Sequence, residues 1–341
     1  AKFTGFKHYR MGIPFVIHRF KTRYGHIPLR TSINQFFGGV FSLAGGFVVG
    51  KEGPAVHLAA AGSHFLGQWF RLPFNCLRIL TGCGIAAGVS AAFNTPFAAV
   101  IFVMEVVLRQ YRVHVFIPIM LAAGCGSVLT RIVFGNENEL IFLTFHVISN
   151  VLLPYLVLFG IALGLLAALF NKQLMLVIST FRHVNMITRL LLAGAITGIV
   201  GYVMPQALGT EFSAIETLFA NDPQLSLLLL LFALKFILAV VAIGLGVPGG
   251  IIGAVMIIGM LAGVILSQPL HSISNQGEMA STFALLGLAG MLAAVLHAPM
   301  AALSAVMELS ASSQVILPAI IVIVSAYVTS KQLCNNRSIF I

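Results

Sequence analysis

Charged side chains are scarce in this sequence. Of its 341 residues, 8% are Asp, Glu, Lys or Arg, whereas 59% are hydrophobic. Soluble domains carry about 25% charged and about 45–50% apolar residues. A soluble fold would have too little polar surface to cover this chain, which indicates a protein whose apolar surface faces lipid.

Cysteine is also rare, and its spacing excludes the usual metal motifs. The four cysteines (Cys76, Cys83, Cys125 and Cys334) show no CxxC pair, and His57, His64, His114 and His297 are scattered without metal-ligand spacing. We therefore expect no metal centre, no disulfide framework and no cofactor.

Acidic residues are outnumbered by basic ones, which gives a net charge of +10. The basic residues are scattered over loops between apolar stretches, which excludes the concentrated basic face of a nucleic-acid-binding protein. The densest run, Arg19 to Arg30, is typical of a cytoplasmic loop under the positive-inside rule.

Long uncharged stretches recur along the whole chain. They are Thr31–Gly50, Ile79–Met104, Val151–Phe170, Leu190–Thr210, Phe236–Leu270 and Leu309–Ser330. A helix of about 20 such residues crosses a bilayer. Gly and Pro interrupt several stretches, as at 247–250, and broken backbone survives in lipid only where protein or a water-filled cavity shelters it. We predict an all-α, multi-pass transporter or channel forming one transmembrane domain over 1–341.

An internal repeat organises the chain. The segment from Gly84 to Glu105 resembles the segment from Gly287 to Glu308, 203 residues later, and both contain a Pro nine residues before the Glu. The run 50–54 aligns more loosely with 250–254. Two repeats, about 1–135 and 145–341, predict a binding site at their interface, with parallel and inverted arrangements both open.

Three of the nine acidic residues lie inside apolar sequence: Glu52, Glu105 and Glu308. An ionisable group at membrane depth is a candidate for function. The other six (Glu137, Glu139, Glu211, Glu216, Asp222 and Glu278) lie in polar surroundings or near an apolar stretch and read as loop or interface residues.

Glu52 stands in the run Gly50-Lys51-Glu52-Gly53-Pro54, directly before a helix-compatible stretch. Pro54 suits a first helical turn, and the free N–H groups of a helix N-terminus attract anions. We expect the carboxylate to compete with a permeating anion, and its protonation to open the path. The plainer alternative is a carboxylate that only caps its helix.

Glu105 and Glu308 occupy equivalent positions, which favours a structural role in bonding backbone N–H groups of a broken helix. Lys51 either adds positive potential beside Glu52 or extends its charge to the membrane surface. Further helix starts at 12–14 and 248–251 predict that several N-termini converge on one site. Backbone donors bind anions weakly enough for the anion to leave again.

These features resemble the CLC family of chloride channels and proton/chloride antiporters over nearly the whole chain. The run at 50–54 is similar to the family's G(K/R)EGP motif, Gly249-Gly250 to the start of its GxFxP segment, and Phe93-Asn94-Thr95-Pro96 to the stretch after the gate. The resemblance implies two inverted repeats, a pore in each subunit of a homodimer, and bound chloride ions. It also implies that the family's first three helices and a soluble CBS regulatory domain are absent from this sequence.

The resemblance implies a set of anion-binding residues: Met11, Gly12, Ile13, Lys51, Gly53, Gly250, Ile251, Ile252 and Phe340. Several depart from the family pattern. Met11 replaces a serine, Phe340 a tyrosine, and Ile252 the phenylalanine of GxFxP. Val106 stands where proton-coupled members carry an inner glutamate. Each lost hydroxyl removes a hydrogen bond of about 1 kcal/mol from the anion.

We therefore predict passive permeation of chloride or a related small anion, gated by Glu52, in a lipid bilayer that we take to be a bacterial inner (cell) membrane. Val106 leaves the proton path without its inner acceptor. A proton-coupled chloride or fluoride antiporter is the alternative. A membrane enzyme would need a nucleophile–base pair or a metal cluster, neither of which the sequence contains, and a non-conducting structural protein would not depend on Glu52.

Overall fold

Helices make up nearly all of the chain that the structure, a computed structural model, describes: residues 12–22, 25–135, 143–210, 224–270, 276–336 and 338–339. The first half contains α1 (Ile13–Thr22), α2 (Leu29–Ala44), α3 (Glu52–Trp69), α4 (Phe74–Phe93), α5 (Pro96–Phe102), the π-helix η1 (Val103–Leu108) and α6 (Val113–Phe134). The second half contains α7 (Leu153–Thr180), α8 (Met186–Val203), α10 (Leu225–Leu245), α11 (Ile252–Ser267), α12 (Gln276–Leu296), α13 (Pro299–Ser310) and α14 (Ile316–Val328). Short helices η2 (Asn150–Leu152), η3 (Pro205–Ala207), η4 (Gln268–Leu270), η5 (Ser313–Val315) and η6 (Thr329–Leu333) connect or extend them.

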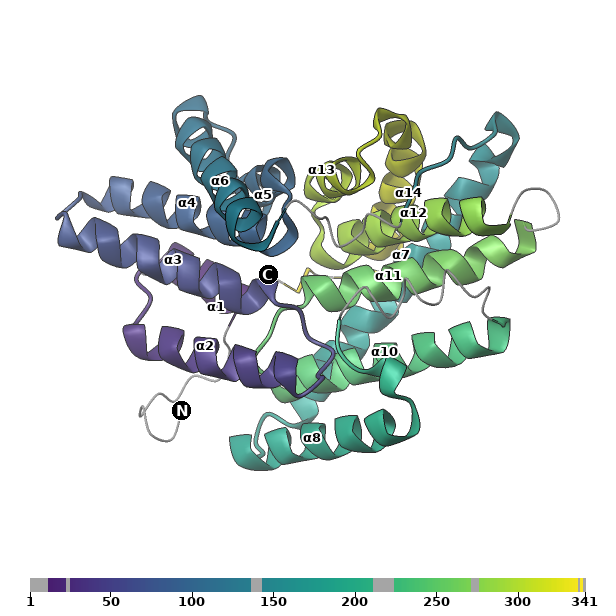
Figure 1. The fold of residues 1–341 in the computed structure, drawn as a ribbon, viewed down its shortest axis with the longest axis horizontal. Coiled ribbons are helices and arrows are strands. Elements are labelled where there is room, and N and C mark those ends of the chain that lie inside the picture. The colour runs from purple at the N-terminus through teal and green to yellow at the C-terminus, as the bar shows by residue number, and fades with distance from the viewer. Residues whose placement is uncertain are drawn as a thin grey trace.

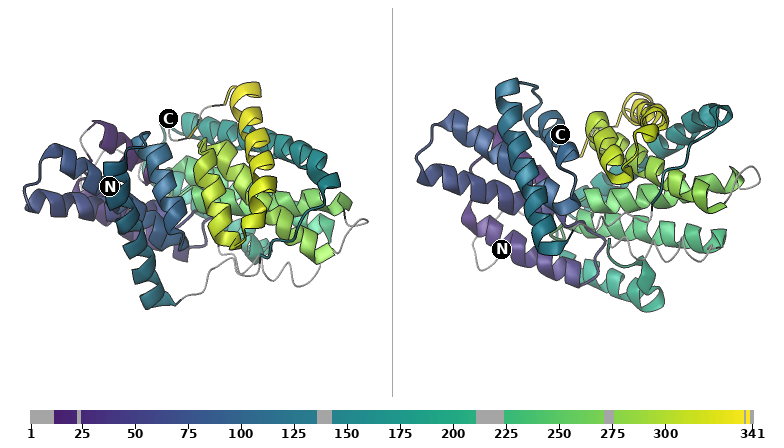
Figure 2. Two further views of the ribbon diagram at one scale, coloured as in Figure 1. Left: turned by 90° about the horizontal axis from the view of Figure 1, so that it is seen from above. Right: turned by 45° about the horizontal axis from the view of Figure 1, so that its top comes forward.

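The two halves lie side by side. In Figure 1, α1 to α6 lie on the left and most of the second half lies on the right, with α8 at the bottom in the middle, and Figure 2 shows the same division from two other directions. Among the described helical segments, eight are long and apolar enough to cross a membrane. This agrees with the multi-pass membrane protein expected from the composition.

Broken helices occur where Gly, Asn and Pro interrupt the apolar stretches. Asn94 adopts a left-handed conformation (φ 54°) that ends α4, and Pro96 then opens α5. In the second half, Gly246 (φ 87°) ends α10, and α11 begins only at Ile252. The stretches 79–104 and 236–270, continuous in hydropathy, are therefore both interrupted, and the break between α10 and α11 lies at the interruption predicted at 247–250.

Equivalent positions of the two repeats pair with each other. Gly50 donates its N–H to the carbonyl of Gly250 (2.8 Å), and Gly250 donates its N–H to the carbonyl of Gly50 (2.7 Å), as an isolated antiparallel bridge. From this bridge α3 and α11 run away from each other (Figure 1). A contact in which each residue meets its own counterpart is what a two-fold relation between the repeats produces.

Two carboxylates also link the repeats reciprocally: each repeat supplies one glutamate that binds the start of a helix in the other repeat. Glu105 accepts hydrogen bonds from the N–H groups of Met300 (3.2 Å) and Ala301 (2.8 Å) at the start of α13. Glu308 accepts from the N–H groups of Phe97 (2.9 Å) and Ala98 (2.8 Å) at the start of α5. These contacts with the N–H groups of a broken helix are the kind that the sequence predicted for both residues.

The exchanged caps satisfy backbone donors that have no partner within their own helix. Since a membrane interior supplies little water, an uncapped first turn would leave these N–H groups without an acceptor.

Glycine lets the helices behind the caps pack closely: a Cβ at Gly84 of α4 would lie 2.5 Å from the carbonyl O of Ala59. At its counterpart Gly287 of α12, a Cβ would lie 2.2 Å from the carbonyl O of Gly259.

Replacing either capping glutamate should destabilise both halves of the protein. In Glu308→Ala or Glu105→Ala, two N–H groups lose a charged acceptor, which costs roughly 2–4 kcal/mol of folding free energy. We expect a lower midpoint of thermal unfolding in a fixed detergent. Glu308→Gln and Glu105→Gln keep one acceptor oxygen and should lose less. Equal midpoints for the Ala variants and the parent would show that the caps do not stabilise the fold.

Candidate functional site

Three helix N-termini meet where the two repeats meet. Gly12 precedes α1, Gly53 lies in the first turn of α3, and Gly249 stands shortly before α11. A Cβ built on Gly12 would lie 3.2 Å from the carbonyl O of Gly249 and 3.9 Å from the Cα of Gly53. The predicted convergence of helix starts at 12–14, 50–54 and 248–251 is therefore present, and it concentrates backbone donors in one place.

The carboxylate of Glu52 lies at this convergence and is fully buried (0% exposed). Its Oε1 accepts a hydrogen bond from the N–H of Ile252 (2.6 Å) and a longer one from the N–H of Gly253 (3.3 Å). Oε2 is buried and has no hydrogen-bond partner. Glu52 begins α3 in one repeat and binds the first turn of α11 in the other, so its carboxylate bridges the repeats.

Glycines form the walls around this carboxylate. A Cβ at Gly50 would lie 1.9 Å from Oε2 of Glu52, and a Cβ at Gly250 would lie 1.9 Å from Oε1. A Cβ at Gly53 would lie 2.5 Å from the carbonyl O of Gly249. Since real contacts of this kind stay beyond about 3 Å, no side chain fits at Gly50 or Gly250 while the carboxylate stays where it is, and none fits at Gly53 while the backbone of Gly249 does.

This arrangement suits a small anion. The donors are backbone N–H groups at the start of α11, and the dipole of that helix places partial positive charge at the same point. The Glu52 carboxylate already supplies one negative oxygen to these donors. An anion could take the same donors only after the side chain of Glu52 has moved away.

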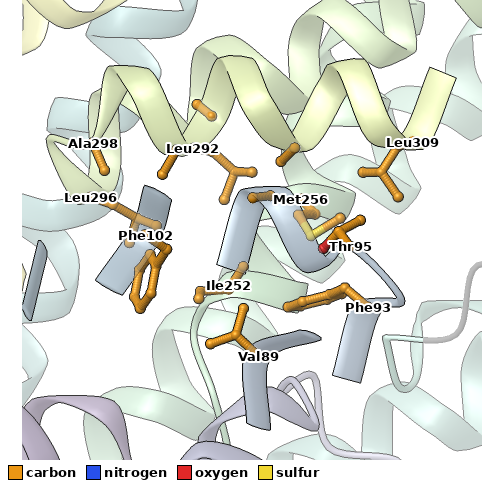
Figure 3. A pocket seen from close by; sticks show the side chains of 14 residues that line it. Val89, Phe93, Thr95, Phe102, Ile252, Met256, Leu292, Leu296, Ala298 and Leu309 are labelled. Atoms are coloured by element: carbon orange, nitrogen blue, oxygen red, sulfur yellow. The ribbon is translucent and has the colours of Figure 1, made fainter. Parts of the chain in front are cut away.

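An apolar cavity of about 40 Å³ lies between the repeats next to this site (Figure 3). Phe93 and Phe102 of the first repeat face Met256 and Leu292 of the second across it. Ile252, whose N–H binds Glu52, also lines it. Of the fourteen residues that line the cavity, Thr95 alone carries a hydroxyl. Water needs two to four polar partners, so such a cavity holds it poorly.

The structure brings together only part of the predicted anion-binding set. Gly250 and Ile252 lie against the Glu52 carboxylate, and Gly12 and Gly53 lie against the backbone of Gly249 beside it. The remaining members of the set that the structure describes are Ile13, buried at the start of α1, Ile251, buried just before α11, and Lys51, partly exposed just before α3. Met11 and Phe340 lie outside the described residues, so their roles stay predictions.

Val106, the residue at the predicted inner position, is buried in η1. It lies four residues after Phe102, which lines the cavity. Because residues four apart share a helix face, Val106 and Phe102 present apolar side chains along one side of this segment. The inner position is therefore as apolar as the sequence indicated.

Three residues around the site were not predicted from the sequence. Gly253 donates its N–H to Glu52, and the hydroxyl of Thr210 donates to the carbonyl of Val49, just before the Gly50 bridge. Lys235 is buried within the apolar helix α10. The signal for Lys235 was a single basic residue in otherwise uncharged sequence, directly before the predicted stretch Phe236–Leu270. Nothing in the sequence signalled Thr210.

Comparisons with known proteins identify the same family that the sequence resembles. Residues 3–331 match the model of a family described as voltage-gated chloride channels. Among solved structures, the chain is similar to a slow cyanobacterial Cl⁻/H⁺ antiporter (23% identity, TM-score 0.86, covering 97% of this chain and 79% of that one). It is also similar to a CLC-type fluoride/proton antiporter (24%, TM-score 0.80, 93% and 79%) and to a eukaryotic CLC transporter (21%, TM-score 0.75, 96% and 58%).

A methyl group on the glycine wall should displace the Glu52 carboxylate. In Gly250→Ala, the new Cβ would overlap Oε1, so we expect the carboxylate to leave the N–H of Ile252. Crystal structures of Gly250→Ala and of Gly62→Ala would test this, since a Cβ at Gly62 meets nothing within 4 Å. A Glu52 side chain in the same place in both variants would contradict the proposed geometry.

Proposed function

The chain belongs to the voltage-gated chloride channel (CLC) family, and we propose that it conducts chloride or a related small anion passively, with the Glu52 carboxylate as the gate. Anion transport is the activity of this family, whose members are channels or transporters rather than enzymes. One observation carries the proposal of the gate. A buried carboxylate occupies the backbone N–H groups at the start of α11, where a permeating anion would bind.

The mechanism follows from competition between two anions for the same donors. While Glu52 is ionised, its oxygen holds the N–H of Ile252 and blocks the site. Protonation removes the negative charge and with it the charge-assisted part of the hydrogen bond, so the side chain is released. Chloride then takes the donors and passes on. The flux of anions should therefore rise as the pH falls.

The absence of proton coupling is proposed from the apolar surroundings of the gate. Val106 offers no proton acceptor, and the cavity that reaches Ile252 is lined almost wholly by hydrocarbon. A chain of water molecules that could carry protons to Glu52 would find few partners there. Anions then move without an exchanged proton.

Proton-coupled antiport of chloride or fluoride is the second candidate. It is favoured by the similarity in fold to a Cl⁻/H⁺ and a fluoride/proton antiporter. In this mechanism Glu52 would itself carry the proton across the site. The two candidates share the anion site and differ in whether a proton moves with each turnover.

Assembly and location complete the proposal. We place the protein in the cell membrane, as a homodimer in which each copy has its own anion path, and a bacterial inner membrane is the setting we propose. Bound chloride is the expected ligand, with no further cofactor. Eight apolar helices among the described segments support the membrane location.

Removing the gate should make conduction independent of pH. In liposomes loaded with chloride, with a potassium ionophore balancing charge, Glu52→Ala should raise efflux at pH 7.5 about tenfold or more, since losing one charge-assisted bond changes the gating equilibrium by that order. Glu52→Gln, which mimics the protonated form, should likewise show a flat pH profile. Parent-like efflux and pH dependence in both variants would rule out Glu52 as the gate.

The mode of transport is tested by the reversal potential of the parent protein in planar bilayers. Under a chloride gradient with equal pH on both sides, and again with a gradient of two pH units, a passive conductor should give the same reversal potential. A shift with the pH gradient would establish coupled antiport instead. Proton movement recorded during chloride efflux gives an independent reading of the same question.

A further inference from the structure

Lys235 lies midway along the apolar helix α10, and its side chain is fully buried (0% exposed). Its Nζ donates to three consecutive carbonyl oxygens, those of Ala207 (3.4 Å), Leu208 (3.1 Å) and Gly209 (3.0 Å). A buried ammonium group is costly unless oxygen atoms surround it. These contacts tie α10 to the segment 207–210, which we call the supporting segment.

The supporting segment belongs to the second repeat but binds the stretch of the first repeat that leads to Glu52. The N–H of Gly209 donates to the carbonyl of Gly46 (2.8 Å). The hydroxyl of Thr210 donates to the carbonyl of Val49 (3.0 Å). Val49 directly precedes Gly50, whose Cα forms one wall of the carboxylate site. Hydrogen bonds to Gly209 and from Thr210, together with the peptide bond between these two residues, thus join the Lys235 ammonium to the residue before that wall.

Thr210 also lies close to the carboxylate site itself. A Cβ at Gly253 would be 3.8 Å from the Thr210 hydroxyl oxygen and 3.5 Å from Oε2 of Glu52. The N–H of Gly253 is one of the donors to Glu52. The supporting segment therefore reaches both the Gly50 side of the site and the first turn of α11.

We propose that Lys235 is a positioning residue for the Glu52 gate. The proposal rests on the proposed function, in which the Glu52 carboxylate blocks the anion site. Lys235 holds the supporting segment, the supporting segment holds 46–49, and this stretch places Gly50 against the carboxylate. Loss of the ammonium frees the stretch, and the ionised Glu52 then leaves its donors more often.

The residue equivalent to Lys235 in the first repeat is uncharged, which indicates that the positive charge has a role in the second repeat only. The residue 200 positions earlier is Gln35, which is also fully buried but neutral. A buried cation at this point of the fold is therefore not required in both repeats. It occurs in the repeat whose segment supports the stretch before Glu52.

The test compares substitutions at both ends of this connection with a matched control. Lys235→Met removes the ammonium and keeps most of the side-chain length. Thr210→Val removes the bond to Val49 and leaves Lys235 in place. Thr329→Val is the control, because it removes a buried hydroxyl that bonds to Ser325 in the preceding turn of the chain. Each substitution is made in the parent and in Glu52→Gln, and chloride efflux from liposomes is recorded from pH 5 to pH 8.

Lys235→Met and Thr210→Val should each raise efflux at pH 7.5 about five- to tenfold in the parent, and flatten its pH dependence, as expected when the closed state is weakened by about the free energy of one hydrogen bond. In Glu52→Gln, where the gate is already released, neither should change efflux by more than about twofold. Lys51, the charged residue next to Glu52, is unchanged in every variant, so a difference between their pH profiles does not come from it. Thr329→Val should leave both profiles unchanged.

Equal loss of efflux in both backgrounds would overturn the proposal and reduce Lys235 to a folding role. If Lys235→Met gives no monodisperse protein, Thr210→Val decides, and an unchanged pH profile in that variant overturns the proposal. If Glu52→Gln does not differ from the parent, the proposed function fails instead. Amide hydrogen exchange over 46–50 then still tests the positioning, because it should be faster in Thr210→Val than in Thr329→Val and equal if the proposal is wrong.

Discussion

A helix that begins inside a membrane exposes N–H groups that neither its own turns nor water can satisfy. Three glutamates meet this need in the described part of the chain, and each does so across the repeats: Glu105 at α13, Glu308 at α5 and Glu52 at α11. The same bond therefore holds the two halves together and forms the candidate site. The fold and the candidate site depend on one kind of interaction.

The three carboxylates differ in how many of their oxygens accept hydrogen bonds. Glu105 and Glu308 each engage both oxygens with backbone donors. Glu52 engages only Oε1, and its Oε2 is buried without a partner. A carboxylate with one orphaned oxygen is held less firmly than one with both satisfied, since a buried unpaired polar atom costs about 1–3 kcal/mol. In the proposed mechanism, this difference in partners is what allows Glu52 to leave its donors while Glu105 and Glu308 stay bound.

Much of the fold and of the candidate site could be predicted from the sequence, because local chemistry determines it. Gly and Pro mark where apolar stretches break, and the 203-residue offset between Glu105 and Glu308 identifies the repeat. The two-fold exchange of contacts could not be read, because parallel repeats would give the same periodicity. Nor could the role of Thr210, whose partner Val49 lies 161 residues away in the other repeat. Such contacts depend on tertiary packing, and no local pattern encodes them.

The exchanged caps also constrain how the protein is made. The acceptor for the first turn of α5, near residue 97, is Glu308, which lies 211 residues later in the chain. During synthesis the first half enters the membrane long before its partner exists, so the donors of α5 must wait for most of the chain to be translated. Insertion machinery, lipid headgroups or trapped water have to shelter this half-built interface in the meantime. Separately expressed halves would face the same requirement and would need to find each other within the bilayer.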